Sequence, residues 1–146
     1  MLIRPALAGD TPAVHRLLED ASLPLDGLPD DFGNQRDFLV ADSGDAVRGA
    51  IGLERYGDSA LLRSAVVAPA LRGTGLGAQL VHALLEHARA TGIRDLVLLT
   101  TTAEHWFPRF GFTRITRAEV PEAMHASAEL QGACPATAVV MRLSFG

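Results

Sequence analysis

The feature that most constrains this chain is a glycine-rich turn between a predicted strand and a predicted helix. Residues 66–78 are VVAPALRGTGLGA, in which an apolar strand stops at Pro69, glycines follow, and a helical apolar pattern starts at Leu76. Glycine lets the backbone approach a ligand closely, and a helix N-terminus offers unpaired N–H groups with a partial positive charge. Such a turn suits a phosphate or pyrophosphate. The alternative is a tight turn that only packs the helix against the sheet.

Composition excludes several classes of protein. The chain has 146 residues, 48% of them hydrophobic and 21% charged, which predicts a single folded domain over residues 1–146. A formal net charge of −4 argues against nucleic acid and against an anionic membrane surface as partners. All 13 basic residues are Arg, so mechanisms that need Lys, such as a Walker-type phosphate loop or a Schiff base, are excluded.

The cysteine content and the N-terminal residues indicate the cellular compartment in which the protein is expected. Cys134 is the single cysteine, which excludes a disulfide within the chain and fits a reducing compartment. The N-terminal residues MLIRPALAGD contain no apolar signal segment, and no run approaches the roughly 18 apolar residues of a membrane helix. We therefore expect a soluble cytoplasmic protein.

Hydrophobic periodicity and turn residues predict an α+β or α/β fold with a mixed sheet and a meander at its middle. The predicted strands are 2–6, 38–41, 47–56, 60–67, 96–99, one opening at 111–112, and 138–145. The predicted helices are one starting at Thr11-Pro12, one from Gly75 to Gly92, a short one at 102–109 and one near 121–130. Residues 22–36 are rich in Pro, Gly and Asp and predict a long loop that could serve as a lid.

A dinucleotide-binding fold does not fit the glycine pattern. That fold places G-x-G-x-x-G after its first strand and an acidic residue at the end of its second strand. Here the pattern is G-x-G-x-G, it follows a late strand, and Asp95 precedes its strand.

The pattern Arg72-x-x-Gly75-x-Gly77, after a strand ending 65–67 and Pro69, resembles the acetyl-CoA motif of the GNAT N-acetyltransferases. The resemblance covers nearly the whole chain and implies the acyl-CoA N-acyltransferase fold, a three-layer, mainly antiparallel mixed sheet flanked by helices. It implies that backbone N–H groups of 73–78 hold the pyrophosphate and that strand 65–67 pairs with the pantetheine arm. The thioester would then lie between this strand and 96–99. The implied cofactor-binding residues are Ala65, Val66, Val67, Arg72, Gly73, Thr74, Gly75, Leu76, Gly77 and Ala78.

A narrower resemblance concerns the substrate. The segments 52–57 (GLERYG), 60–64 (ALLRS), 100–107 (TTTAEHWF) and 129–138 (ELQGACPATA) are similar to those of ArsN-type arsenic-resistance N-acetyltransferases. The Thr-Thr-x-x-x-x-Trp-Phe-x-x-x-Gly-Phe part is also similar to N-acetylglutamate synthases. Both resemblances imply acetylation of the α-amino group of glutamate or of a mimic, and arsinothricin or phosphinothricin is the first expectation.

Acetyl transfer needs a neutral amine, so a carboxylate should accept the ammonium proton. Glu54, on the strand before the cofactor strand, is the candidate base; the alternative is a solvent-facing strand residue. The backbone N–H near Val67 is the candidate for polarising the thioester carbonyl. Many GNAT enzymes carry a Tyr where this chain has Phe107, which cannot donate a proton. The acid for the thiolate therefore stays open among Tyr56, Ser64, His105 and water.

An acidic amino acid carries anionic groups that Arg binds bidentately. Arg63, beside Ser64, is the first candidate for substrate binding, and Arg36 and Arg109 are weaker ones. Thr101 and Thr102 follow the predicted central strand, where a hydroxyl could contact substrate or cap a helix. No metal is expected, because the five histidines lack metal-ligand spacing. Cys134 is expected to be a packing residue, with a reactive thiol as the alternative.

Three alternatives to an arsenic- or phosphorus-resistance enzyme stay open at this point. One is an enzyme like N-acetylglutamate synthase, and another is a GNAT enzyme for a different small amine, such as a polyamine or a protein N-terminus. The third is a non-catalytic acyl-CoA-binding module that regulates a partner. Family members often dimerise, so a homodimer through the last strands is a further expectation.

Overall fold

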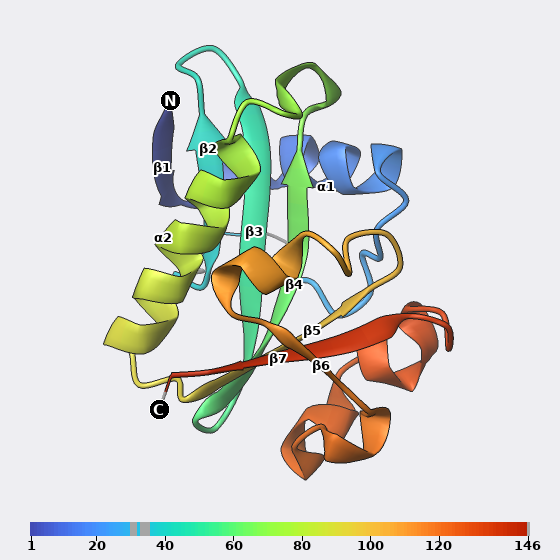
Figure 1. Cartoon of the computed structure of the whole chain (residues 1–146). Helices are drawn as coiled ribbons and strands as arrows, with labels where there is room; N and C mark the ends of the chain where they lie inside the picture. The colour runs from blue at the N-terminus through green and yellow to red at the C-terminus, as the bar shows by residue number, and fades with distance from the viewer. Residues whose placement is uncertain (30–31, 33–35, 146) are drawn as a thin grey trace.

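The computed structural model describes residues 1–29, 32 and 36–145 and contains one seven-stranded sheet (Figure 1). The strands are β1 (Leu2–Pro5), β2 (Phe38–Asp42), β3 (Val47–Tyr56), β4 (Ser59–Val67), β5 (Asp95–Thr100), β6 (Thr113–Ile115) and β7 (Val139–Ser144). The α-helices are α1 (Thr11–Asp20) and α2 (Leu76–Ala90). Short helical turns are η1 (Ala8–Asp10), η2 (Pro69–Leu71), η3 (Phe107–Phe110), η4 (Arg117–Glu119), η5 (Glu122–Ala126) and η6 (Glu129–Ala133).

The sheet has the order β1-β2-β3-β4-β5-β7-β6. Only β4 and β5 are parallel, and every other neighbouring pair is antiparallel. The prediction of a mixed, mainly antiparallel sheet with a central meander is therefore confirmed. Pro5 lies in the edge strand β1, as its missing N–H group requires.

The two helices cover opposite faces of the sheet, which gives three layers (Figure 1). On one face, the apolar side of α2 buries Leu80 and Leu84 against residues such as Ile51 and Leu62. On the other face, Val14 and Leu18 of α1 pack with apolar side chains of β2 to β4; these are Phe38, Val40, Ala50 and Val66. The η5 and η6 region covers the second face further along, where Met124 packs on β5 and β7.

Two predicted helices are wrong in extent. The segment 102–109 forms only the turn η3, because Pro108 lacks an N–H group and Gly111, at φ +101°, ends the turn. Residues 121–130 form η5 and the start of η6 in place of one helix, because Ser127 between them is extended (φ −64°, ψ 138°). The predicted loop 22–36 lies partly outside the described residues.

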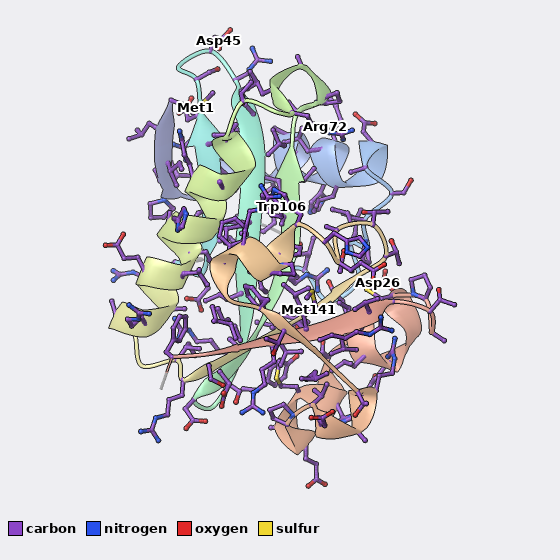
Figure 2. All side chains as sticks on the ribbon, in the orientation of Figure 1. Met1, Asp26, Asp45, Arg72, Trp106 and Met141 are labelled. Atoms are coloured by element: carbon purple, nitrogen blue, oxygen red, sulfur yellow. The ribbon has the colours of Figure 1, made fainter. Side chains whose placement is uncertain are left out.

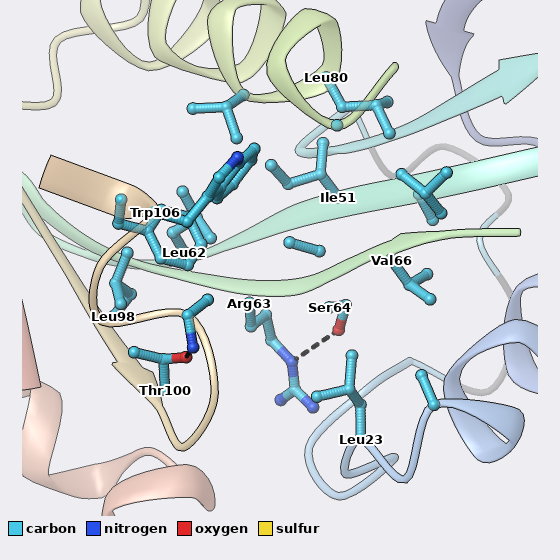
Figure 3. A pocket seen from close by; sticks show the side chains of 18 of the residues that line it. Leu23, Ile51, Leu62, Arg63, Ser64, Val66, Leu80, Leu98, Thr100 and Trp106 are labelled. Carbon is cyan, nitrogen blue, oxygen red and sulfur yellow. Dashed lines mark hydrogen bonds between the residues drawn. The ribbon is translucent and has the colours of Figure 1, made fainter. Parts of the chain in front are cut away.

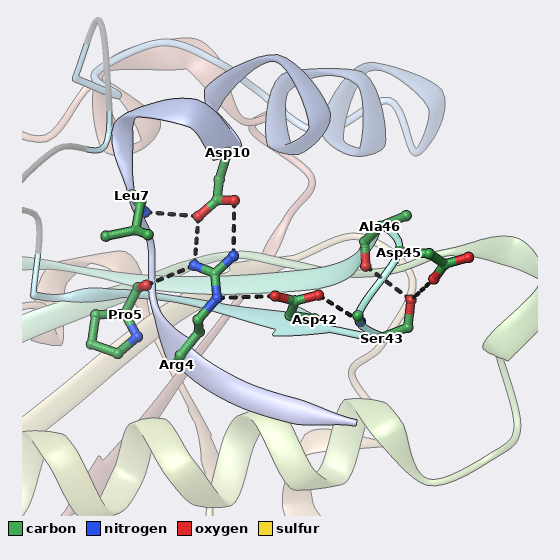
Figure 4. A network of polar contacts seen from close by, with 9 residues as sticks. Arg4, Pro5, Leu7, Asp10, Asp42, Ser43, Asp45 and Ala46 are labelled. Carbon is green, nitrogen blue, oxygen red and sulfur yellow. Dashed lines mark hydrogen bonds and ion pairs between the residues drawn. The ribbon is translucent and has the colours of Figure 1, made fainter.

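One ion-pair network joins the N-terminal elements (Figure 4). The guanidinium of Arg4 donates from Nη1 to Oδ2 of Asp10 at 2.7 Å and from Nε to Oδ2 of Asp42 at 3.2 Å. The backbone N–H of Leu7 donates to the same carboxylate of Asp10 at 2.7 Å. The network ties β1, η1 and β2 together, on the far side of β3 from β5.

Candidate active site

A gap opens in the sheet where β4 and β5 separate. Their parallel pairing covers only Ser59 to Leu61 on β4 and Asp95 to Val97 on β5, although β4 continues to Val67. Opposite β3, the register of β4 also shifts, because Ala50 pairs with Val66 and Gly52 pairs with Arg63. Two residues of β4, 64 and 65, thus face one residue of β3, which is a β-bulge.

The bulge is centred on Ser64, which has φ +60°. This conformation is uncommon for a residue other than glycine, and such backbone strain tends to occur at functional sites. The extra residue bends β4 and brings Arg63 and Val66 onto the same face of the sheet, opposite α2. Without the bulge, two residues three apart on a strand would point to opposite faces.

A cleft of about 670 Å³ passes through this gap (Figure 3). One end is the turn before α2, and the other end lies against Leu23 and Pro24 of the loop after α1. Its wall includes most of the residues predicted to bind cofactor and substrate. They are Arg63, Ser64, Ala65, Val66, Val67, Arg72, Gly73, Gly75, Gly77 and Ala78.

The turn before α2 presents a set of unpaired backbone donors. Gly75 is the N-cap of α2 at φ +88°, and no side chain caps the helix. The first N–H group with a partner one turn back is that of Gln79, which donates to the carbonyl of Gly75 at 3.1 Å. The preceding N–H groups, at residues 75–78, are the donors that every helix start leaves without internal partners. They fit an anionic group such as a pyrophosphate.

Close packing on the cleft side limits side-chain size at Gly77. A Cβ added there would lie 3.4 Å from Cζ2 of Trp106, whose ring stands beside α2 (Figure 2). At Gly73 and Gly75 a Cβ would meet nothing within 4 Å, but both residues have positive φ. The glycines therefore serve backbone conformation at 73 and 75 and close packing at 77.

The backbone N–H of Val67 points into the gap. Hydrogen-bonded and non-hydrogen-bonded pairs alternate along an antiparallel ladder. The N–H of Ala68 donates to the carbonyl of Arg48 at 2.7 Å, so that pair is hydrogen-bonded. The neighbouring pair, Val67 with Gly49, is therefore not, and the N–H of Val67 points away from β3 to the side that β5 has left.

Arg63 lies at the inner end of the cleft with a side chain that is 0% exposed. Its Nη1 donates to Oε1 of Glu54 at 2.5 Å and to the carbonyl of Asp26 at 2.7 Å. Its Nη2 donates to the carbonyl of Pro24 at 3.0 Å, and its Nε donates to Oγ of Ser64 at 3.1 Å (Figure 3). Among the described contacts, one Nη2 hydrogen stays unused. Arg63 therefore fastens the loop after α1 to β3 and β4.

Glu54 is held on three sides. Besides Arg63, the hydroxyl of Tyr56 donates to its Oε2 at 2.6 Å and the hydroxyl of Ser127 at 3.2 Å. Burial, followed by this bond to Glu54, raises the pKa of Tyr56. The sequence thus predicts both members of the Glu54–Arg63 pair, but as separate functional residues.

Glu129 is a site residue that the sequence analysis missed. It is 4% exposed, lines the cleft, and places Oε2 3.4 Å from Nε of Arg63. Burial raises the pKa of its carboxyl, and the charge of Arg63 opposes that rise. No local pattern indicated this position, because Arg63 and Glu129 belong to distant segments. We call Arg63, Glu54 and Glu129 the Arg63 cluster.

The three threonines after β5 occupy different places. Thr101 lines a neighbouring cavity of about 250 Å³, whereas Thr100 and Thr102 line both that cavity and the cleft. Neither Thr101 nor Thr102 caps a helix, because the next helical turn, η3, has no side-chain cap; Oγ1 of Thr100 accepts from the N–H of Ala103 at 2.9 Å within the connecting turn. Among the candidate acids for the thiolate, His105 has a side chain that is 94% exposed. Phe107, which stands where many GNAT enzymes carry Tyr, is buried.

Cys134 is half-buried beside Glu129. Burial, then the charge of Glu129, raises the pKa of its thiol to about 12.

Within the described ranges, no group of three or more His, Cys, Asp or Glu is arranged to hold a metal ion. In the same part of the chain, no helix is long and apolar enough to cross a membrane.

Comparison with known proteins gives the family. A family model described as an acetyltransferase (GNAT) domain matches residues 34–114, more than half of the chain. The chain belongs to the GNAT acetyltransferase family. The predicted fold class and the predicted GNAT family are thereby confirmed.

The curated proteins to which this chain is similar are amino-acid acetyltransferases. An amino-acid acetyltransferase of Aeromonas salmonicida is 31% identical over 122 residues, which are 82% of this chain and 25% of that protein. One from Ralstonia nicotianae is 42% identical over 69 residues, which are 47% of this chain and 15% of that protein. The chain spans between 15% and 29% of the length of the curated relatives it matches.

Solved structures share the fold. N-acetylglutamate synthase from Neisseria gonorrhoeae, complexed with coenzyme A and N-acetyl-glutamate, superposes with a TM-score of 0.83 at 23% identity, over 99% of this chain and 35% of that chain. Rv2747 from Mycobacterium tuberculosis, in complex with CoA, gives 0.79 at 22% identity and covers 100% of both chains. The curated relatives are named as amino-acid acetyltransferases, which agrees better with the alternative of an enzyme like N-acetylglutamate synthase than with the expected arsenic-resistance enzyme.

Proposed function

We propose that this chain binds acetyl-CoA in the cleft and acetylates the α-amino group of an amino acid, with glutamate as the first candidate. The observation that supports this most is the course of the cleft. It leads from the unpaired N–H groups before α2, along the free edge of β4, to the buried Arg63 cluster. An anion site, an open strand edge and a charged inner end thus lie in one continuous space. The relatives named as amino-acid acetyltransferases support the same substrate class.

The chain's own backbone would hold the cofactor. The N–H groups of residues 75–78 suit the pyrophosphate, and Arg72, exposed at the mouth of the cleft, adds a positive charge. Along β4, the backbone of 65–67 is free on the β5 side and suits the amide groups of the pantetheine arm, as in β-strand addition. Gly73, Thr74 and Leu76 complete the predicted cofactor contacts.

Acetyl-CoA, when bound, supplies the acetyl group as a thioester. The N–H of Val67 suits the role of donor to the carbonyl oxygen as negative charge develops there. A carboxylate of the Arg63 cluster accepts the ammonium proton of the substrate; the sequence favours Glu54, and Glu129 is the second carboxylate of that cluster.

Arg63 is the proposed contact for a carboxylate of the substrate. Its unused Nη2 hydrogen allows one hydrogen bond, whereas a bidentate contact requires a carbonyl of the loop 24–26 to move away. Ser64 and Thr101 are the other proposed substrate contacts. Thr101 lies with Thr100 and Thr102 in the cavity beside the cleft, where a substrate side chain would meet hydroxyl groups.

Thiol release from acetyl-CoA tests the proposal. The purified protein is assayed with glutamate, other amino acids, phosphinothricin, arsinothricin and spermidine. Fast release confined to glutamate and its close analogues supports the proposal, and preference for the phosphorus or arsenic mimics supports the narrower prediction of a resistance enzyme. Release with spermidine alone contradicts an amino-acid substrate. Coenzyme A binding with no release for any amine favours a regulatory acyl-CoA-binding module.

Two further expectations belong to the same proposal. A homodimer through the last strands and a cytoplasmic location stay predictions. Size-exclusion chromatography with light scattering checks the first, and fractionation of the source cells checks the second.

A further inference from the structure

The Arg63 cluster contains two carboxylates, and they differ in their access to the cleft. Glu129 lines the cleft, whereas Glu54 is not among the described residues of its wall. Gly27, in the loop after α1, packs over Glu54, since a Cβ at Gly27 would lie 3.7 Å from its Oε1. A substrate in the cleft therefore reaches Glu129 first.

The two carboxylates also differ in their remaining capacity to accept a proton. Glu54 accepts hydrogen bonds from Arg63, Tyr56 and Ser127, and these take up most of the positions of an ionised carboxylate. The carboxylate of Glu129 makes one ion pair, at 3.4 Å to Nε of Arg63, and has one further hydrogen bond, with the thiol of Cys134. Glu129 therefore keeps acceptor positions for a substrate ammonium group.

We propose that Glu129 is the catalytic residue that takes a proton from the substrate ammonium, and that Glu54 is a positioning residue that fixes Arg63. This inference rests on the proposed function. The sequence analysis assigned the role of general base to Glu54, and this inference assigns it to Glu129, which lies on a distant segment. Arg63 holds both carboxylates in place.

The charges around Glu129 fit that role. It faces Arg63 on β4, Glu54 on β3 and the thiol of Cys134 on its own segment. With both carboxylates ionised the cluster carries one net negative charge, which favours a cationic amine. Burial raises the pKa of Glu129, the charge of Arg63 and the hydrogen bond from Cys134 oppose that rise, and the charge of Glu54 adds to it. A base whose pKa is raised towards neutrality is better matched to an ammonium group.

The proton balance is complete with the proposed reactants. One N–H bond of the ammonium group breaks, its electron pair stays on nitrogen, and the proton binds a Glu129 oxygen. The nitrogen lone pair forms the C–N bond as the C–S bond breaks and sulfur leaves with its electron pair. The second proton of the nitrogen goes to sulfur, so the products are amide and thiol. Glu129 then returns its proton to water.

The kinetic test compares Glu129→Gln, Glu54→Gln and Glu122→Gln. Glu122 is an exposed carboxylate of η5 and is the matched control. Thiol release with glutamate is measured as kcat/KM against pH. We expect the rate of Glu129→Gln to be at least about 100-fold lower, as for loss of a general base. Its kcat/KM should also no longer decrease at low pH, because the group whose protonation causes that acid limb is gone. Glu54→Gln should keep that acid limb, and Glu122→Gln should match the unchanged protein.

A second measurement does not depend on turnover. The side-chain carboxyl carbons of ¹³C-glutamate-labelled protein are titrated by NMR, and Glu129→Gln identifies the resonance of Glu129. We expect that resonance to titrate above the ordinary glutamate range. Coenzyme A affinity reports folding, and if Glu129→Gln does not fold, Glu129→Asp should keep the acid limb at a lower rate.

The outcomes separate the two proposals. An acid limb that persists in Glu129→Gln, or one that Glu54→Gln removes, overturns the role of Glu129 and leaves the acetyltransferase proposal intact. A Glu129 resonance in the ordinary range also counts against that role. No thiol release by the unchanged protein with any amine overturns the proposed function, and the role of Glu129 falls with it.

Discussion

Nη1 of Arg63 lies 2.5 Å from Oε1 of Glu54, and the two residues are diagonal neighbours on adjacent antiparallel strands. Gly52 pairs with Arg63 and Glu54 pairs with Leu61, so both charged side chains share the face opposite α2. With a guanidinium that is 0% exposed, the pair is part of the fold as well as of the candidate site.

Loss of the arginine should therefore destabilise the protein. Arg63→Met leaves two carboxylates and two loop carbonyls without their partner, and removing one member of a buried pair costs about 3–5 kcal/mol. Urea unfolding measures the loss. The control Arg48→Met breaks an exposed pair with Asp45 and should cost less than about 1 kcal/mol. Equal losses in the two variants contradict a structural role for Arg63.

The glycine at the start of α2 allows a test that separates backbone strain from cofactor binding. Gly75→Ala should cost about 1 kcal/mol because φ is +88°, and should weaken coenzyme A binding by shifting the N–H groups. Gly44→Ala, in the turn between β2 and β3 at φ +97°, has the same strain far from the cleft. Calorimetric titration with coenzyme A should show weaker binding only for Gly75→Ala. Similar affinity in both variants argues against the anion site.

Turn residues account for the parts of the site that the sequence predicts. The turn at Gly57-Asp58 joins β3 to β4, and the pairing of Tyr56 with Ser59 fixes the register that brings Glu54 beside Arg63. The contact between Glu54 and Arg63 could therefore be predicted from the sequence, although the sequence analysis gave the two residues separate roles. The glycine-rich turn likewise predicted the helix start and its donors.

The place of Glu129 in the site could not be predicted from the sequence, for a physical reason. It contacts Arg63 through the packing of η6 on the sheet, and the chain between β6 and β7 has only short turns with no regular period. The sequence also does not show the bulge at Ser64. β4 is mostly apolar and buried along most of its length, so its sequence has no alternation that an extra residue would interrupt, and only the pairing with β3 shows that residue.

Acid sensitivity should follow from the Arg4 network. The hydrogen bond from Arg4 comes first among the causes that hold the pKa of Asp10 below its usual range, and burial opposes it. A lowered folded-state pKa means that the stabilisation is present above the unfolded pKa of about 3.9 and is lost as pH falls through the folded value. Arg4→Met should remove it, so the difference in melting temperature between the two proteins should shrink below about pH 4. A difference that stays constant from pH 3 to pH 7 contradicts this linkage.

The reactivity of the Cys134 thiol reports on the charge of Glu129, which lies beside it at the inner end of the cleft. With its pKa raised to about 12 by burial and by Glu129, little thiolate is present at pH 7.5. Compared with an ordinary cysteine of pKa about 8.5, the thiolate fraction should be lower by roughly 10³-fold. Alkylation by iodoacetamide should therefore be slow in the folded protein and fast in urea. Glu129→Gln removes the neighbouring negative charge and should speed alkylation without unfolding, whereas the distant Glu86→Gln should not. If both variants react at the unchanged rate, burial alone protects the thiol and Glu129 is not ionised beside it.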